Sequence, residues 1–395
     1  MTPLRDTFST LPAELLGEVF TAYASVFPDA PIVLGAVSRR VRSVAFSTPS
    51  VWSHLELGDR DDDSKKAALW FEQSKAHHVN VQINLSHSGR PQQHGVSETA
   101  EKTLAVSKTL QSHTDRITSF CVRSETPSQA QTTLAAIYSE LAEANANVAL
   151  RTLSINAATS SSSPSPATLK PFPCISTIVE LDVNNIPITA LLNVGLNTLR
   201  SLRISQSLVS TPMAVDDIVE LIRLAPQLRR LDLDGRIADP TAGTSDLEQC
   251  FLPHLSVLHL RANNIIALLD HLILPSLRVL HLNDLDGRRA NASVEMGTAL
   301  HRLLVRMELG KGDVKKNGLR VLELTGIDAD LGERAWQQCM QKMTLEVFTS
   351  HPPPPERGWE TPAGFFSSVF GEDVVAEEEE PTRPGKAGFG FDFGF

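Results

Sequence analysis

One recurring pattern constrains this chain more than any other feature: an apolar residue, two variable residues, a second apolar residue, one variable residue and a third apolar residue. The copies are Leu150-Leu153-Ile155, Ile178-Leu181-Val183, Leu199-Leu202-Ile204, Leu228-Leu231-Leu233, Leu255-Leu258-Leu260, Leu277-Leu280-Leu282 and Leu319-Leu322-Leu324. Successive copies start 28, 21, 29, 27, 22 and 42 residues apart. A unit of this size cannot bury its apolar face alone, so we expect the units to stack on one another.

Each copy predicts one short parallel strand whose alternating apolar residues face inward, while the segment between two copies returns along the other side. Helical spacing marks several returns, as in Ile218-Leu221-Ile222, Leu300-Leu303-Leu304-Met307 and Trp336-Cys339-Met340. The spacing of the copies is that of irregular leucine-rich repeats. The fold class that follows is α/β, with a solenoid of parallel strands over residues 147–350.

Residues 58–146 carry a weaker form of the same pattern. Ile117-Phe120-Val122 is an earlier copy, and Val79-Val81-Ile83-Leu85 alternates as a strand does. Helices are expected over 65–75, 98–112 and 129–144. We interpret this region as connecting, degenerate early repeats that cap the open edge of the sheet.

The variable residues of each strand are expected to share one face and to form columns across neighbouring strands. In the late repeats this places three valines beside two histidines, an arginine and a glutamate, an apolar strip with polar edges suited to a peptide. The predicted substrate-binding residues are Val257, His259, Arg261, Val279, His281, Val321 and Glu323. The alternative is that Asp182, Arg203 and Asp232 neutralise one another laterally and that the valines fill a face without a ligand.

A metal or catalytic interpretation of the same columns is also open. Asp232, His259, His281 and Glu323 could converge as ligands because adjacent strands lie roughly 4.8 Å apart, although the 42-residue spacing before Leu319 leaves the register of Glu323 undetermined. Hydrogen-bonded histidines are preferred, and neither a metal nor a cofactor is expected. No nucleophile elbow, phosphate-binding loop or H-E-x-x-H motif occurs, so a hydrolase or metalloenzyme is the weaker alternative.

The first sixty residues have a different, purely helical pattern. Pro12 suits the start of a helix that carries Leu15, Leu16, Val19, Phe20 and Tyr23. Pro28 and Pro31 bracket a break, after which Leu34, Val37, Val41 and Val44 mark a second helix. A third short helix or turn follows Pro49, with Trp52 as its expected anchor. Three short helices supply little core, so this module needs a partner or a neighbour.

This segment resembles the fungal-type F-box in the order and spacing of specific residues. The shared positions are Leu11-Pro12, Glu14-Leu15-Leu16, Val19-Phe20, Pro31, Leu34, Val37-Ser38-Arg39-Arg40 and Ser47-Thr48-Pro49 leading to Trp52. Val41 departs from the pattern, since many relatives carry Trp there. The resemblance implies docking on a Skp-type adaptor and, through it, on a cullin scaffold that carries a ubiquitin-conjugating enzyme. The adaptor-binding residues that it implies are Leu11, Pro12, Leu15, Leu16, Val19, Phe20, Pro31, Leu34, Val37 and Trp52.

Composition narrows the remaining possibilities. The net charge is −10, of which residues 356–395 carry −6, so no broad basic field for nucleic acid is expected. The four cysteines are far apart without a C-x-x-C pair, which predicts reduced thiols rather than zinc or disulfides. No long apolar segment predicts export or membrane spanning, so we expect a cytoplasmic or nuclear protein. The segment 157–171 and the tail 351–395, rich in acidic residues, phenylalanine and glycine, are expected to be disordered.

The sequence thus predicts four parts: an F-box-like three-helix module over 5–57, the connecting region 58–146, the solenoid 147–350 and the tail 351–395. The expected function is non-catalytic: the substrate-recognition subunit of an SCF-type E3 ubiquitin ligase, bridging the adaptor to an unidentified protein target. The alternative is a leucine-rich-repeat interaction scaffold that does not recruit a ligase, a possibility that Val41 leaves open.

Overall fold

The computed structural model describes residues 11–58, 60, 62–85, 105–144, 148–158, 172–208, 210–239, 248–285, 292–309 and 318–352. The chain divides into two units between Pro353 and Pro354, and all described residues belong to the first. The predicted disorder of 157–171 and 351–395 therefore falls almost entirely outside the described residues. Of these two segments, Ala157, Ala158, His351 and Pro352 are described, and the prediction is wrong for Ala157 and His351, each of which ends a strand.

The described unit is an α/β structure built on one parallel sheet of 11 strands. The strands are β1 (His54–Leu57), β2 (Val79–Asn84), β3 (Ile117–Ser124), β4 (Thr152–Ala157), β5 (Glu180–Asn184), β6 (Ser201–Ser205), β7 (Arg230–Gly235), β9 (Val257–Ala262), β11 (Val279–Asp284), β12 (Val321–Thr325) and β13 (Val347–His351). Their order in the sheet is their order along the chain. Every recurring copy from Leu150 to Leu324 supplies one of these strands, so the predicted parallel strands are confirmed.

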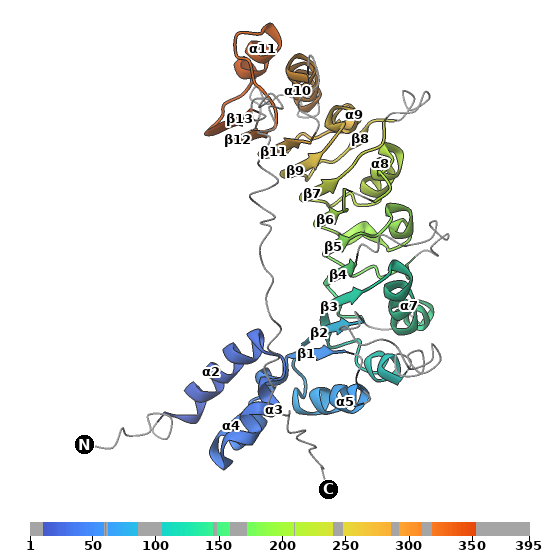
Figure 1. The fold of residues 1–395 in the computed structure, drawn as a ribbon, viewed down its shortest axis with the longest axis vertical. Coiled ribbons are helices and arrows are strands. Elements are labelled where there is room, and N and C mark those ends of the chain that lie inside the picture. The colour runs from blue at the N-terminus through green and yellow to red at the C-terminus, as the bar shows by residue number, and fades with distance from the viewer. Residues whose placement is uncertain are drawn as a thin grey trace, which may run out of the picture. The chain divides into compact units, whose positions relative to one another are not determined.

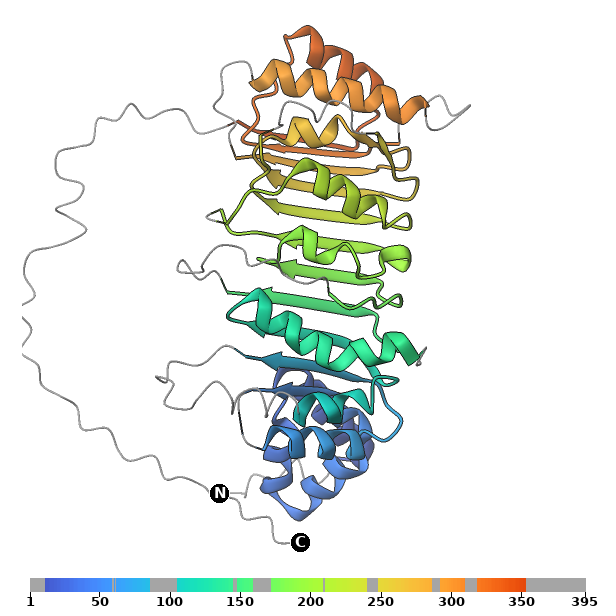
Figure 2. The ribbon, with the colours of Figure 1, turned by 90° about the vertical axis from the view of Figure 1, so that its right-hand side faces the viewer.

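Helices cover one face of this sheet, as Figures 1 and 2 show. They are α5 (Asp63–Gln73), α7 (Pro127–Ala144), α8 (Val215–Arg223), α9 (Ile265–Leu269), α10 (Ala292–Leu309) and α11 (Arg334–Lys342), with a helical segment at 105–111. The 3₁₀ turns η2 (Ile188–Leu191) and η3 (Leu196–Thr198) replace a helix between β5 and β6. Two short strands, β8 (Cys250–Phe251) and β10 (Leu272–Ile273), pair as a second parallel sheet.

The core follows the alternation of the strands. In β4 to β12 the apolar residues of the recurring pattern are buried, whereas the residues between them are partly or wholly exposed. The covering helices contribute their apolar faces, for example Ile218 and Leu221 of α8, which are fully buried. Every second side chain of each strand thus packs against the apolar faces of the helices, whose side chains recur every 3.6 residues. The two layers together bury one continuous core.

Asparagine side chains join successive turns at the ends of the strands. Asn185, which has a φ of 56°, donates from Nδ2 to the Ala157 carbonyl oxygen (2.9 Å) and accepts from the Ser207 N–H (2.8 Å). Three strands further along, Asn263 Oδ1 accepts from the Ile237 N–H (2.6 Å). These bonds satisfy backbone groups that have no partner in the sheet and hold neighbouring strands in register.

The N-terminal residues form α2 (Ala13–Val26), α3 (Ala30–Val37), α4 (Arg39–Ser47) and the 3₁₀ helix η1 (Pro49–Trp52). The expected single second helix is wrong: Ser38 has an extended backbone (φ −158°) and caps α4 by accepting from the Val41 N–H (3.2 Å). Pro31 does not break a helix, because it lies in the first turn of α3, where a missing N–H costs nothing.

Trp52 joins these helices to the sheet. It is fully buried, and its indole N–H donates to the Ala45 carbonyl oxygen (2.9 Å). Its ring meets the ring of Trp70 on α5 edge to face, with centroids 5.0 Å apart. The expectation that Trp52 anchors this segment is confirmed.

Candidate functional site

The sheet face opposite the covering helices carries three columns of side chains in exact register. The central column is continuous through Asp182, Arg203, Asp232, His259, His281 and Glu323, which lie opposite one another on β5, β6, β7, β9, β11 and β12. The 42-residue spacing before Leu319 therefore does not shift the register, and Glu323 lies directly beside His281. The predicted columns are confirmed.

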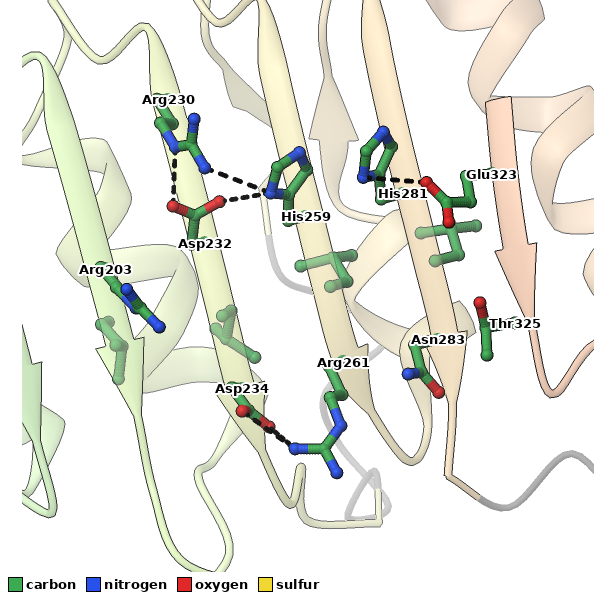
Figure 3. A pocket seen from close by; sticks show the side chains of 14 residues that line it. Arg203, Arg230, Asp232, Asp234, His259, Arg261, His281, Asn283, Glu323 and Thr325 are labelled. Atoms are coloured by element: carbon green, nitrogen blue, oxygen red, sulfur yellow. Dashed lines mark hydrogen bonds and ion pairs between the residues drawn. The ribbon is translucent and has the colours of Figure 1, made fainter. Parts of the chain in front are cut away.

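A hollow of about 340 Å³ lies on this face, over β6 to β12. The side chains labelled in Figure 3 belong to β6, β7, β9, β11 and β12. Its lining consists of Arg203, Ile204, Arg230, Asp232, Leu233, Asp234, His259, Leu260, Arg261, His281, Leu282, Asn283, Glu323 and Thr325. Three arginines and three carboxylates balance formally, so the hollow is strongly polar but has no net charge when both histidines are neutral.

Asp232 lies at the centre of a network of polar contacts in the hollow. Its Oδ2 accepts from Arg230 Nε (2.7 Å), and its Oδ1 lies 2.7 Å from His259 Nδ1. The Arg230 Nη2 to His259 Nδ1 distance is longer, at 3.4 Å. His259 Nδ1 thus faces both the Asp232 carboxylate and the Arg230 guanidinium.

The two histidines stack face to face. Their ring centroids are 4.2 Å apart and their planes are 11° from parallel. His281 Nδ1 lies 3.4 Å from Glu323 Oε2, so each imidazole has a carboxylate at Nδ1 (Figure 3). Both contacts leave Nε2 as the ring nitrogen through which a ligand could be bound.

Partial burial lowers the pKa of His259 below its ordinary value; Asp232 opposes this effect, while His281 and Arg230 reinforce it. Partial burial also disfavours the charged form of Asp182, and for a carboxyl group this raises the pKa. Arg203 opposes this rise, and Asp232 strengthens it. Because its pKa is lowered, His259 is neutral at neutral pH, so its contact with Asp232 is not an ion pair.

At the opposite end of the hollow, Arg261 Nη1 lies 3.1 Å from both carboxylate oxygens of Asp234 on the adjacent strand. Arg203, by contrast, is exposed, and its guanidinium has no ion pair or hydrogen bond among the described residues. The hollow therefore offers one arginine without a direct carboxylate contact among the described residues, beside two arginines that have one.

The predicted substrate-binding residues fall into two groups. His259, Arg261, His281 and Glu323 line the hollow, whereas Val257, Val279 and Val321 do not. These valines form the adjacent column in mutual register, and Val347 of β13 extends it. The sequence prediction omitted Arg203, Arg230, Asp232, Asp234, Asn283 and Thr325, although the strand pattern had already placed them in the same columns.

The chemistry of the lining favours recognition. Among the described lining residues there is no serine, cysteine or lysine, and the one hydroxyl, that of Thr325, lies on β12, two strands away from His259 on β9. No group of three or more His, Cys, Asp or Glu residues in the described part of the chain is arranged to hold a metal ion. What the face presents is a set of hydrogen-bond donors and acceptors next to an apolar strip.

A second surface lies on the N-terminal helices, where one of two adjacent apolar residues is exposed and the other is buried. Leu15 and Val19 are 47% and 50% exposed, whereas their neighbours Leu16 and Phe20 are 1% and 3% exposed. The exposed set of large apolar residues on α2 to α4 is Leu15, Val19, Tyr23, Val26, Phe27, Ile32, Val33, Val37 and Phe46. Leu15, Val19, Tyr23 and Val26 recur every three or four residues, so they form one stripe along α2.

Burial also divides the ten predicted adaptor-binding residues. Pro12, Leu15, Val19 and Val37 are exposed, and Leu11 and Leu34 are half-buried. Leu16, Phe20, Pro31 and Trp52 are buried, which leaves them no surface for a partner. Their part in any docking surface is to support it from the core.

The fold and this site define an α/β protein with a sequentially ordered parallel sheet, one face of which is covered by helices and the other polar and open. No protein-family model matches the chain, and no curated protein matches it in sequence. None of the described helices has both the length and the apolar character that membrane spanning requires.

Proposed function

We propose that this chain is the substrate-recognition subunit of an SCF-type E3 ubiquitin ligase. In this proposal the N-terminal helices are an F-box that binds a Skp-type adaptor and, through it, a cullin scaffold. The stacked strands are an irregular leucine-rich-repeat solenoid whose open face binds the protein target. The subunit catalyses nothing itself; it holds a target lysine near the ubiquitin-charged enzyme and so raises the effective concentration.

The observation that carries the proposal is the exposed apolar surface on α2 and α3. Val26 and Val37 are 68% and 65% exposed, and the stripe begins within the segment that resembles an F-box. A stripe of exposed apolar side chains such as the one along α2 is costly in water and is typical of a docking site. The buried positions that the resemblance shares, Leu16, Phe20 and Trp52, would fix the angle at which the stripe is presented.

Co-purification with a Skp-type adaptor tests the proposal. In Leu15→Asp/Val19→Asp the charges fall on the exposed stripe, and we expect adaptor binding to weaken by roughly tenfold or more, because central apolar anchors dominate such interfaces. The matched control is Leu331→Asp/Val294→Asp, which changes the same residue types at 49% and 41% exposure outside the N-terminal helices. This control variant is expected to retain full capture.

Circular dichroism and thermal melting would first establish that all three proteins are folded. Failure of the folded parent to capture the adaptor would contradict the ligase assignment and leave a repeat scaffold without ligase recruitment. Equal losses in both double variants would show that the stripe has no special role.

A further inference from the structure

Five exposed arginines occupy one equivalent position in the stacked units. Each directly follows the first apolar residue of a recurring copy; the five are Arg151, Arg200, Arg229, Arg278 and Arg320. We call this set the arginine row. None of these residues lines the hollow.

Main-chain hydrogen bonds place the arginine row in a single line along the edge where the strands begin. Arg229 donates its N–H to the Arg200 carbonyl oxygen (2.8 Å), and Arg320 donates to Arg278 (2.8 Å). Val179 and Ser256 bridge the two gaps: Val179 bonds to Arg151 and Arg200, and Ser256 bonds to Arg229 and Arg278. The equivalent position therefore recurs on each strand from β4 to β12, and successive arginines of the row lie one or two strands apart, or roughly 4.8 or 9.6 Å.

The positive charge of the row is largely uncompensated. Arg320 pairs with Glu346 at 3.4 Å, and within the described ranges no ion pair joins the other four guanidinium groups to a carboxylate. In the hollow, by comparison, Arg230 and Arg261 each have an aspartate partner. Like charges at this spacing repel one another, so the arginine row costs stability unless a partner neutralises it.

We propose that the arginine row binds an extended, carboxylate-rich segment of the target protein. This inference rests on the proposed function, because it assigns the chemistry of the target to the face that would hold it. Six strand steps span roughly 29 Å, which is the length of about nine residues of extended chain. Guanidinium groups suit the purpose because their planar donor forks match carboxylates.

The charges around the row favour an acidic peptide over nucleic acid. On β5 to β7 the neighbouring columns carry Glu180, Asp182, Asp232 and Asp234 interspersed with Arg203 and Arg230, so they add no basic field for a phosphate backbone spread across the sheet. The row is one residue wide, and the whole chain carries −10. A nucleic-acid footprint requires a broader basic field.

Binding of a fluorescent nonaglutamate peptide to the full chain, measured by anisotropy at low salt, tests this assignment. In Arg200→Gln/Arg229→Gln/Arg278→Gln we expect affinity to fall roughly tenfold or more, since three charge-assisted contacts are lost. The control Arg223→Gln/Arg302→Gln/Arg334→Gln removes the same charge from α8, α10 and α11 and is expected to bind as the parent does. Added salt is expected to weaken parental binding.

Three results would overturn the proposal: no binding by the parent, equal losses in both triple variants, or tighter binding of oligothymidylate than of nonaglutamate. Tighter binding of a charge-matched phosphoserine peptide would overturn the assignment to carboxylates. Adaptor capture by the same proteins separates the two proposals. Peptide binding without capture would refute the ligase assignment alone, and capture without peptide binding would refute the arginine row alone.

Discussion

At the scale of single residues, the protonation of His259 on the open face makes the stability of the fold depend on pH. The pKa of His259 is lowered chiefly by burial, so the folded protein binds a proton at this site less readily than the unfolded chain does. The stabilising contribution is therefore fully present above the unfolded value near 6.5 and is lost as pH falls through the lowered folded pKa.

The variant His259→Gln tests this sign. We expect the stability of the parent relative to the variant, measured by urea unfolding, to be greater at pH 7.5 than at pH 5.5. Titrating groups distant from His259 are common to both proteins and cancel in the comparison. A relative stability that instead grows on acidification would mean that Asp232 raises the pKa of His259 and outweighs burial.

Single residues also show which features could not be predicted from the sequence. The pairs Leu15-Leu16 and Val19-Phe20 look equivalent in the sequence, yet one member of each is buried and the other exposed. Helical geometry separates neighbours by about 100°, but it does not state which side meets the core. That choice depends on distant partners, such as Ser50, whose hydroxyl lies 2.9 Å from the Thr21 hydroxyl of α2.

At the scale of elements, the strands of the recurring pattern were predictable because the buried positions of each strand are apolar and alternate with the exposed positions along the sequence. β1 and β13 were not predicted. β1 has four residues and directly follows η1, while β13 has no fully buried residue. The columns of the open face followed from the same pattern, but the hollow did not, because it depends on which long side chains pair across strands.

The division between α3 and α4 was missed because apolar spacing continues across Ser38. The structure assigns the boundary to a side-chain cap, so Ser38→Ala should destabilise the N-terminal helices by about 1 kcal/mol. Ser38→Asp keeps an acceptor and adds a favourable charge at the helix N-terminus, so it should be neutral or stabilising. Urea unfolding of both variants measures the difference; equal destabilisation would show that the hydrogen bond to Val41 is not the cap that matters.

At the scale of the whole molecule, the sheet ends in an edge that its own sequence protects. β13 covers β12 and has a polar end, Thr349-Ser350-His351. Deleting residues 344–395 would uncover the backbone of β12, and we expect that protein to self-associate, because unpaired strand edges template further pairing.

The matched control is deletion of residues 353–395, which retains β13. Size-exclusion chromatography with light scattering should show a monomer for this control at concentrations where the longer deletion forms larger species. Identical behaviour of the two proteins would show that β13 does not protect the edge.

The agreement between strand order and chain order also governs how the molecule can be made. During synthesis each strand from β2 onward emerges after the neighbour on which it will pair, so the nascent chain can add one strand at a time to an edge already formed. No strand of the large sheet has to wait for a distant segment still inside the ribosome. The disadvantage of this arrangement is that, until translation ends, the most recently added strand has an unpaired edge that other chains can contact.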